Sequence, residues 1–200
     1  AMGSKKKKGI TNETQPIDLC ALAVNLGCTF VARSFSGAKK QLTSLMKAAM
    51  SHKGFALIDI ISPCVTFNNN DESMRSYGYV KENDVELHSV DYIPSFSPME
   101  EVEIPAGAFR DIELHDGSVV RLETISEDHD LFNPVDALAA LHNAEKEKKH
   151  VTGLLYFDPT KLTADEEQNL VDTPLSQLSE EQMRPSKESL DGILAGFRNQ

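Results

Sequence analysis

Apolar residues follow two alternating periods in the first third of the chain, and this alternation predicts helices and strands in turn. Two stretches place them every three to four positions, as on one face of an amphipathic helix, and each is followed by a short, unbroken apolar run. The predicted elements are a helix over 16–26, a strand over 29–33, a helix over 37–51 and a strand over 55–61. Pro16 suits the start of the first helix and Gly27 its end, and Ser36 can cap the second.

The two predicted strands and the helix between them form a βαβ pattern, which is typical of a parallel sheet. The run from Phe55 to Ile61 has no helical period and is rich in branched residues, so we expect a strand that is buried on both faces. A sheet of only two parallel strands cannot cover itself. Further strands must therefore come from elsewhere, and we expect them from an absent N-terminal half, a partner subunit, or both.

The remaining two thirds of the chain change in character. The stretch 68–98 is irregular, with a short helix within 72–80 interrupted at Gly78, and two prolines mark a linker at its end. Beyond it we predict a strand over 101–104, a hairpin of strands 110–114 and 119–125 around the Asp-Gly turn, a helix over 133–149, a strand over 151–157, a short helix after Thr163 and a final helix after Ser186. The predicted fold class is α/β, with a flexible segment over 1–15, a parallel-sheet part over 16–98 and an α+β extension over 99–200.

Composition narrows the function classes. The chain has 200 residues and a formal net charge of -11, which argues against a nucleic-acid binder because such proteins need a basic face. No apolar stretch is long enough to span a bilayer and no secretory signal is present, so we expect a cytoplasmic protein without membrane contact. The start, Ala-Met-Gly-Ser, resembles a cloning scar or an internal stretch of a longer protein. On either interpretation we expect the natural N-terminus to be missing.

Cys64 is the main candidate for chemistry. Ser62 and Pro63 stop the predicted strand over 55–61, so the thiol is presented just beyond the carboxyl end of that strand, where open α/β sheets bind ligands. A buried structural thiol is an equally weighted alternative. Nucleophilic catalysis needs a base, and His52 lies at the other end of the strand. A metal or cluster ligand is the better functional interpretation, but an iron–sulfur cluster needs about four cysteines, so three would come from outside this chain.

The other cysteines and the histidines are weaker candidates for metal ligands. Cys20 falls on the apolar face of the first helix and Cys28 precedes a strand, so we expect both in the core. The six histidines are scattered, and His129, between Asp128 and Asp130, is interpreted as part of a solvated acidic loop. No phosphate-cradling motif is present.

Three segments together resemble one family. They are Pro-Ile-Asp-Leu-Cys-Ala-Leu-Ala-Val from Pro16, Thr-Phe-Val-Ala-Arg-Ser-Phe-Ser-Gly from Thr29, and the string from His52 that ends in Ser-Pro-Cys-Val-Thr-Phe-Asn at Asn68. These segments are similar to the β subunit of the 2-oxoacid:ferredoxin oxidoreductases, especially the 2-oxoglutarate branch. Later segments, including Thr-Gly-Leu-Leu-Tyr-Phe-Asp-Pro from Thr152, resemble that subunit's C-terminal extension.

The resemblance implies an enzyme with several cofactors and partners. Such enzymes decarboxylate a 2-oxoacid oxidatively with thiamine diphosphate and Mg²⁺, pass electrons through a [4Fe–4S] cluster to ferredoxin, and form an acyl-coenzyme A. The β subunit works with an α subunit that completes the active site. Cys64 matches the family's last cluster ligand. The resemblance thus implies a thiamine diphosphate-binding domain, of which 16–98 would be the C-terminal half.

This chain departs from the family pattern in two places. It lacks both the N-terminal cysteine motif and the Gly-Asp-Gly-Asp type of diphosphate and Mg²⁺ motif. We therefore predict that the chain alone is inactive and completes an enzyme whose other ligands lie elsewhere. A non-catalytic interaction or assembly module that kept the fold is the alternative, and a small metal protein built on Cys64 from several chains is a third. Ferredoxins are usually acidic, so Lys39, Lys40, Lys47 and Lys53 are candidates for a docking patch, with an ordinary solvated helix face as the favoured alternative.

Overall fold

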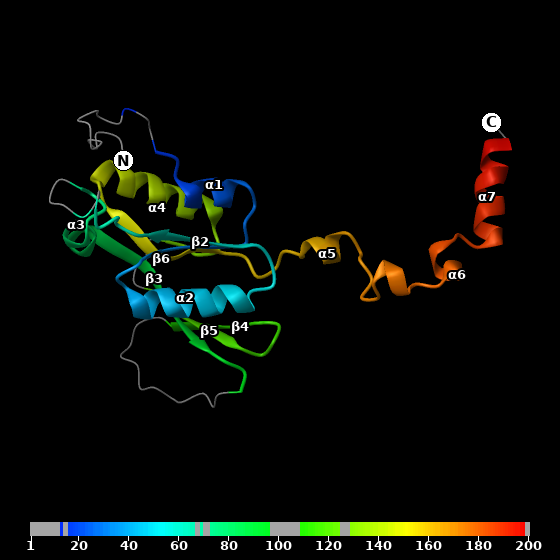
Figure 1. Ribbon diagram of the computed structural model, residues 1–200, viewed down its shortest axis with the longest axis horizontal. Coiled ribbons are helices and arrows are strands. Elements are labelled where there is room, and N and C mark those ends of the chain that lie inside the picture. The colour runs from blue at the N-terminus through cyan, green and yellow to red at the C-terminus, as the bar shows by residue number, and fades with distance from the viewer. Residues whose placement is uncertain are drawn as a thin grey trace. The chain divides into compact units, whose positions relative to one another are not determined.

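The computed structural model describes residues 13, 16–66, 69, 73–96, 109–124 and 129–198, with backbone alone at 109, 110 and 122–124. The described chain falls into one compact unit within residues 1–163 and a second within 164–200. The first unit is built on a six-stranded mixed sheet with helices on both faces (Figure 1). This confirms the predicted α/β class.

The elements of the first unit follow the chain in a regular order. They are α1 (Leu19–Asn25), β1 (Phe30–Phe35), α2 (Lys39–Ser51), β2 (Ala56–Ile61), α3 (Tyr77–Asn83), β3 (Asp84–Ile93), β4 (Phe109–Glu113), β5 (Val119–Thr124), α4 (Pro134–Glu147) and β6 (His150–Phe157). Across the sheet the strand order is β2-β1-β6-β3-β5-β4. The division at residue 98 stays a prediction, and the sheet runs without interruption through strands from both sides of that position.

Strands β1 and β2 are parallel, as the βαβ pattern predicts, with α2 as the connection between them. We expected the neighbouring strands to come from outside this chain, and for β1 this expectation was wrong. Strand β6 of this same chain pairs with β1 in the antiparallel direction, and β3 pairs with β6 in parallel. The prediction missed this because a strand's place in a sheet depends on pairing between residues more than a hundred positions apart, which no local pattern records.

Strand β2 differs from its prediction in burial. It was expected to be buried on both faces, but it is an edge strand in the described sheet, and its residues are mostly half-buried, with Ile60 42% exposed. A continuous apolar run is typical of central strands, yet the composition alone does not say which neighbours the strand has. The open edge of β2 therefore presents apolar side chains next to the site described below.

Two apolar cores lie on opposite faces of the sheet. Helices α1 and α4 contact each other and cover one face, where Cys20, Val31, Leu141 and Leu155 are packed together. Helix α2 covers the other face, and its Leu45 and Ala48 pack with Phe30 and Phe157. Both helices of the first face and α2 stand on either side of the sheet in Figure 1. Strand β1 is buried along most of its length because it is covered on both sides.

Two helices begin a few residues later than predicted. Helix α1 begins at Leu19, because Asp18 accepts a hydrogen bond from the Ala21 N–H and acts as the N-cap. Ile17, expected on the apolar stripe, is 76% exposed. Helix α2 begins at Lys39 after Ala38, which makes no side-chain cap, so Ser36 does not have the predicted capping role.

The middle of the chain contains a strand that the pattern did not predict. Strand β3 occupies ten residues of the stretch expected to be irregular, and α3 runs through Gly78 rather than stopping there. Alternation of apolar residues along β3 breaks at His88, where the register against β6 shifts in a β-bulge. The β4–β5 hairpin around 115–118 is confirmed. The predicted strand over 101–104 lies outside the described residues.

Gly153 of β6 allows the backbones of β6 and β3 to approach each other closely at that bulge. It has a φ of +88°, and an added Cβ would come within 2.4 Å of the His88 carbonyl oxygen. Only glycine adopts this conformation without strain and leaves room for the neighbouring backbone. Helix α4 has its predicted start, because the Asn133 side chain accepts a hydrogen bond from the Val135 N–H and proline occupies the first turn.

In its described residues, 164–198, the second unit is made of short helices. These are α5 (Ala164–Glu167), the 3₁₀ helix η1 (Leu175–Gln177), α6 (Glu180–Met183) and α7 (Lys187–Arg198), and none has a buried residue. Ser186 accepts a hydrogen bond from the Ser189 N–H, which confirms the predicted cap of the final helix. None of the helices in the described ranges has the length and apolar character that crossing a membrane requires.

Candidate functional site

The carboxyl ends of β1 and β2 meet at one edge of the sheet. Phe35 and Ile61 are register partners at the ends of the two parallel strands. The Ser36 N–H donates a hydrogen bond to the Ile61 carbonyl oxygen at 2.9 Å, so the loops that follow both strands leave the sheet together. In α/β proteins such an edge is the usual place for ligand binding.

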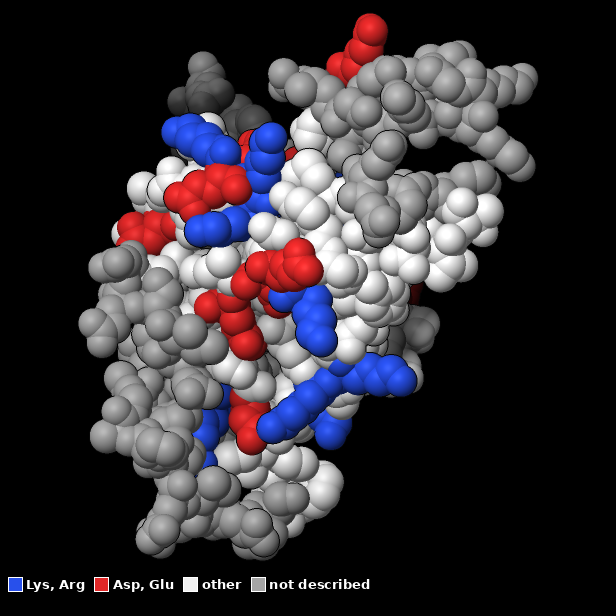
Figure 2. Space-filling model, turned by 90° about the vertical axis from the view of Figure 1, so that its left-hand side faces the viewer, with Lys and Arg blue, Asp and Glu red and all other residues white. Residues whose placement is uncertain are grey.

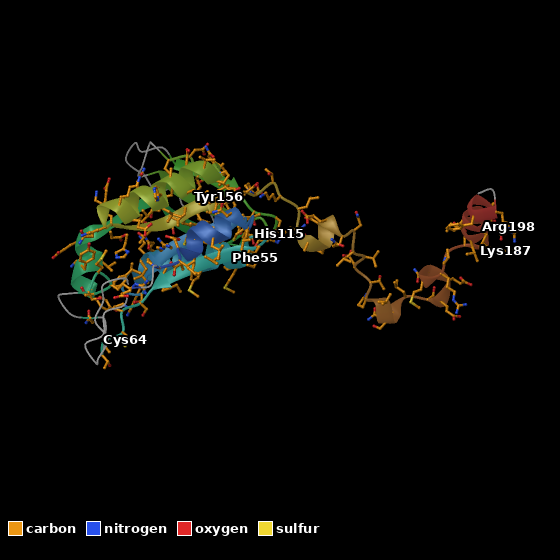
Figure 3. All side chains as sticks on the ribbon, turned by 90° about the horizontal axis from the view of Figure 1, so that it is seen from above. Phe55, Cys64, His115, Tyr156, Lys187 and Arg198 are labelled. Atoms are coloured by element: carbon orange, nitrogen blue, oxygen red, sulfur yellow. The ribbon has the colours of Figure 1, made fainter. Side chains whose placement is uncertain are left out.

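Cys64 lies on the loop that leaves β2 at this edge. Pro63 is buried and anchors the loop, whereas Cys64 is exposed. Figure 3 shows Cys64 at the end of the unit away from Phe55 and His115, with its side chain pointing outward. The thiol is thus presented beyond the strand, as predicted, and is not enclosed by aliphatic neighbours. Its role as a ligand stays a prediction.

The other two thiols are confirmed as core residues. Cys20 is fully buried, and burial raises the pKa of its thiol to about 12. Cys28 is 2% exposed and its sulfur lies 3.1 Å from the Phe55 carbonyl oxygen. Burial also raises the pKa of the Cys28 thiol, so neither sulfur is available as a thiolate near neutral pH. Cys64 is the accessible cysteine of this chain.

Aromatic packing supports the neighbouring loop between β1 and α2. Phe35 and Tyr77 make an edge-to-face contact with ring centroids 4.8 Å apart. Gly37 lies against both rings, and a Cβ there would come within 2.6 Å of Phe35 and 2.8 Å of Tyr77. The close approach explains the glycine. It also fixes where α2 begins, with Lys39 and Lys40 in its first turn and no acidic residue to offset the helix dipole.

A cleft of about 210 Å³ opens beside this edge, between the start of α1 and the end of α4. Arg33 forms its floor. The guanidinium donates to Asp18 Oδ1 at 2.8 Å and to Asp59 Oδ2 at 2.9 Å, and its side chain is only 11% exposed. Burial alone would lower the pKa of Arg33, but the Cys20 thiol and the carboxylates of Asp18 and Asp59 raise it overall. Arg33 therefore stays charged and is held by two acids.

The rim of the cleft carries both signs of charge. Arg75, Lys148, Lys149 and Glu145 line it, and Figure 2, which faces this side, shows basic and acidic side chains interspersed rather than segregated. The floor has two carboxylates for one guanidinium, so Arg33 is not free to receive an anionic ligand. We conclude that the Asp18–Arg33–Asp59 cluster ties α1, β1 and β2 together and positions the edge that bears Cys64.

This cluster was not among the predicted site residues. Its sequence signal is a single charged residue inside each of two otherwise uncharged strands, Arg33 in β1 and Asp59 in β2. Charges in such positions are rarely buried unless they are paired, so the two could have been matched across the predicted parallel pair.

The described residues offer few donors for an iron–sulfur cluster. Cys64 supplies one exposed sulfur, and the described residues contain no group of three His, Cys, Asp or Glu side chains that could hold a metal. One exposed thiol could supply at most one of the roughly four ligands that such a cluster needs.

His129 corrects a further prediction. It was interpreted as part of a solvated acidic loop, but it is 6% exposed and bonded to His88. The interpretation failed because the two acidic neighbours dominate the local pattern, whereas the partner lies 41 residues away.

The first part of the chain is similar in sequence to known proteins. Residues 1–60 match the family model described as "Thiamine pyrophosphate enzyme, C-terminal TPP binding domain". The chain is 36% identical over 96 residues to the 2-oxoacid:ferredoxin oxidoreductase subunit beta of Saccharolobus solfataricus, covering 48% of this chain and 28% of the relative. It is 33% identical over 105 residues to the 2-oxoglutarate synthase subunit KorB of Methanocaldococcus jannaschii, covering 48% and 37%.

A solved structure matches the chain over a greater length. It is a 2-oxoglutarate:ferredoxin oxidoreductase from Magnetococcus marinus with 2-oxoglutarate, coenzyme A and succinyl-CoA bound. The TM-score is 0.56 at 20% identity, and the match covers 96% of this chain and 49% of that chain, which shows a shared fold. The chain spans 28% and 37% of the length of the two sequence relatives above. In sequence, then, this chain is similar to the β subunits of the 2-oxoacid:ferredoxin oxidoreductases, which are subunits of oxidoreductase enzymes, and its fold matches that of a solved 2-oxoglutarate:ferredoxin oxidoreductase.

Proposed function

We propose that this chain is the C-terminal portion of a β subunit that serves in the oxidative decarboxylation of a 2-oxoacid, 2-oxoglutarate in the first instance. The reaction yields an acyl-coenzyme A and sends electrons to ferredoxin. The similarity to the subunit KorB and to a 2-oxoglutarate enzyme supports the choice of substrate. Thiamine diphosphate with Mg²⁺ supplies the decarboxylation chemistry when bound, and the family match over 1–60 supports that cofactor. We assign none of its contacts to a residue of this chain.

The observation that carries the proposal is the position of Cys64. It is the exposed cysteine of the chain, and it follows a buried proline at the edge where two parallel strands end. A thiolate in that position can complete the coordination of a [4Fe–4S] cluster together with three external cysteines. The Asp18–Arg33–Asp59 cluster and the Ser36–Ile61 hydrogen bond stabilise this edge of the sheet. The loop that carries Cys64 therefore starts from a fixed position.

The function requires polypeptide beyond this sequence. We propose an α subunit as the partner that completes the active site, and a cytoplasmic complex. Helix α1 supports a subunit contact because it is apolar on two sides: Cys20 and Val24 are buried in the chain's own core, whereas Leu19 and Leu22 are 51% and 46% exposed. A helix that is apolar all round is usually covered on both sides.

The outer face of α2 is our proposed docking surface for ferredoxin. Its exposed residues fall on one side of the helix: Lys39, Lys40, Thr43, Met46, Lys47 and Met50. Met46 and Met50 are 45% and 85% exposed and would act as apolar anchors. The lysines, with no acidic residue on the helix, would attract an acidic partner. This surface begins at the same sheet edge as Cys64, which would keep the electron path short.

The test of the proposal uses the complete enzyme, in which this chain is joined to its N-terminal half and assembled with the α subunit. Cys64→Ser should abolish the EPR signal of the reduced [4Fe–4S] cluster and electron transfer to ferredoxin. Cys28→Ala, which removes a buried thiol, should retain the signal. A wild-type-like cluster signal in Cys64→Ser would refute the ligand role. A complex with no turnover of 2-oxoglutarate, even with all ligands present, would favour the non-catalytic assembly module.

Charge reversal tests the docking surface separately. Lys40→Glu with Lys47→Glu should raise the KM for ferredoxin about tenfold at low salt and weaken its salt dependence, because steering by surface charge is screened by salt. Turnover with a small dye acceptor should stay unchanged. An unchanged KM for ferredoxin would refute the surface without affecting the role of Cys64.

A further inference from the structure

Two histidines form a hydrogen-bonded pair in the interior of the first unit. His88 Nε2 of β3 and His129 Nδ1 of the segment before α4 lie 2.7 Å apart, and the ring centroids lie 4.9 Å apart. The residues are 2% and 6% exposed. One ring donates its N–H and the other accepts, so the accepting ring must be neutral.

The outer nitrogen of each ring makes protonation unfavourable. Within the described part of the chain, His88 Nδ1 and His129 Nε2 are buried and have no hydrogen-bond partner. In the neutral pair one of them is a bare nitrogen and the other an N–H. A proton on the pair would turn both into N–H donors without acceptors and would place a positive charge in the core.

The described residues of β5, β6 and α2 around the pair are mostly uncharged. Gly153 of β6 and Thr124 of β5 are the backbone partners of His88 in the sheet. On the α2 side, Leu45 and Ala48 pack in the same apolar cluster as Val90 and Leu131, which lie two residues from the respective histidines.

Two acids act against this environment. Asp136, in the first turn of α4, and Asp130 favour the protonated ring of His129. A hydrogen bond with the His129 backbone and the charge of Asp130 favour the protonated ring of His88. The carboxylate oxygens of Asp130 and Asp136 are already bonded, to the Phe132 N–H and to the Asp130 N–H and Asn133 side chain respectively. Burial outweighs them. Burial, and then the neighbouring His129, lowers the pKa of His88 to about 4, and burial lowers that of His129.

The pair joins β3 to the segment that leads into α4, in addition to the apolar cluster that Val90 and Leu131 share. His88 lies at the bulge where β3 shifts register against β6. His129 lies four residues before Asn133, the N-cap of α4. Between them the Phe157 N–H donates to the Leu131 carbonyl oxygen at 3.0 Å, which ties this segment to β6 as well.

We propose that the His88–His129 hydrogen bond is an acid-sensitive contact. It holds the segment before α4 against the sheet at neutral pH and releases this segment when the pair takes up a proton. Both pKa values are lower in the folded chain than the ordinary 6.5 of an unfolded one. The contribution of the pair to stability is therefore complete above pH 6.5 and decreases as the pH falls toward about 4.

The experiment measures urea unfolding of the full 200-residue chain by circular dichroism at several pH values. From about pH 6.5 to about pH 4.5, the unfolding equilibrium constant of the wild type should rise about 10- to 100-fold more than that of the double variant His88→Gln with His129→Gln. His142→Gln, at an exposed position on α4, should follow the wild type. The same pH dependence in the wild type and in the double variant would overturn the proposal.

A second measurement, on the wild type, tests the proposal even if the double variant does not fold. In the wild type, the NMR shifts of the His88 ring should stay at their neutral values down to about pH 5, and those of the His129 ring should change only below the ordinary pKa of 6.5. The amide signals of 129–133 should change together with the His88 ring. Titration of both rings near the ordinary value, with no change in those amide signals, would equally overturn the proposal.

Discussion

Arg33 and Asp59 face each other as register partners on the parallel strands β1 and β2, and Arg33 Nε donates to Asp59 Oδ2 at 2.9 Å. Asp18, the N-cap of α1, binds the same guanidinium. One side chain thus connects the first helix and two strands of the sheet directly below the cleft. Since the guanidinium is largely buried, each carboxylate compensates for a charge that water no longer reaches.

Removal of one carboxylate should therefore be costly. Asp59→Ala leaves Arg33 with a single partner, and we expect a loss of about 2–3 kcal/mol in the free energy of unfolding, below the value for a fully buried pair because Asp59 is partly exposed. Urea denaturation of the chain measures it. Asp111→Ala, which removes the more exposed partner of Arg121, is the control and should cost less than about 1 kcal/mol. Equal losses would contradict this account of Arg33.

The bulge at Gly153 should not tolerate a side chain. Gly153→Ala brings a Cβ against the His88 backbone and requires a positive φ, so we expect a loss of at least about 2 kcal/mol and a clear drop in Tm. Gly192→Ala on α7 meets no atom within 4 Å and should leave the Tm of the first unit unchanged while it raises helicity slightly. A neutral Gly153→Ala variant would mean that the sheet does not need this close approach.

The three thiols should differ sharply in reactivity. A disulfide reagent that forms a coloured product should modify Cys64 in the native chain, because this sulfur is exposed. Cys20 and Cys28 should react only after unfolding, since burial protects them and raises the pKa of both thiols. The measurement is the number of thiols released before and after addition of denaturant. Two or more fast-reacting thiols in the folded chain would show that the core is more open than described.

The outer face of α1 should matter for assembly and little for folding. Leu22→Glu changes a 46% exposed side chain, so the free energy of unfolding of the chain should change by less than about 1 kcal/mol. In the complete enzyme the same change should weaken association with the α subunit at least tenfold, as measured by analytical ultracentrifugation. Val24→Glu, on the buried face, should instead unfold the chain. Unaltered assembly of Leu22→Glu would remove this surface from the interface.

Local patterns predicted a large part of the site's position. The turn residues Ser62 and Pro63 end β2 where the apolar run ends, and the position of Cys64 beyond them follows from those residues alone. The hairpin of β4 and β5 was likewise predictable, because an Asp-Gly turn between two alternating runs acts over a few residues.

Other features could not be predicted in this way. Strand β3 contains a bulge that breaks its alternation at His88, and the bulge exists only because Gly153 of β6 lies beside it. His129 is buried against His88 of β3, which lies 41 residues earlier in the chain. The edge position of β2 and the insertion of β6 next to β1 are also relations between distant segments.

For this protein, the sequence by itself determined which segments become helices and strands near the N-terminus, that β1 and β2 run parallel, and that Cys64 follows the second of them. Helix caps, turn residues and apolar periods act over a few positions, so they can be read without knowledge of the fold. Only the tertiary structure decided the strand order, the three-way contact of Arg33 and the pairing of His88 with His129. Those contacts join residues 15 to more than 100 positions apart, and they form only where the packed sheet excludes water and brings them together.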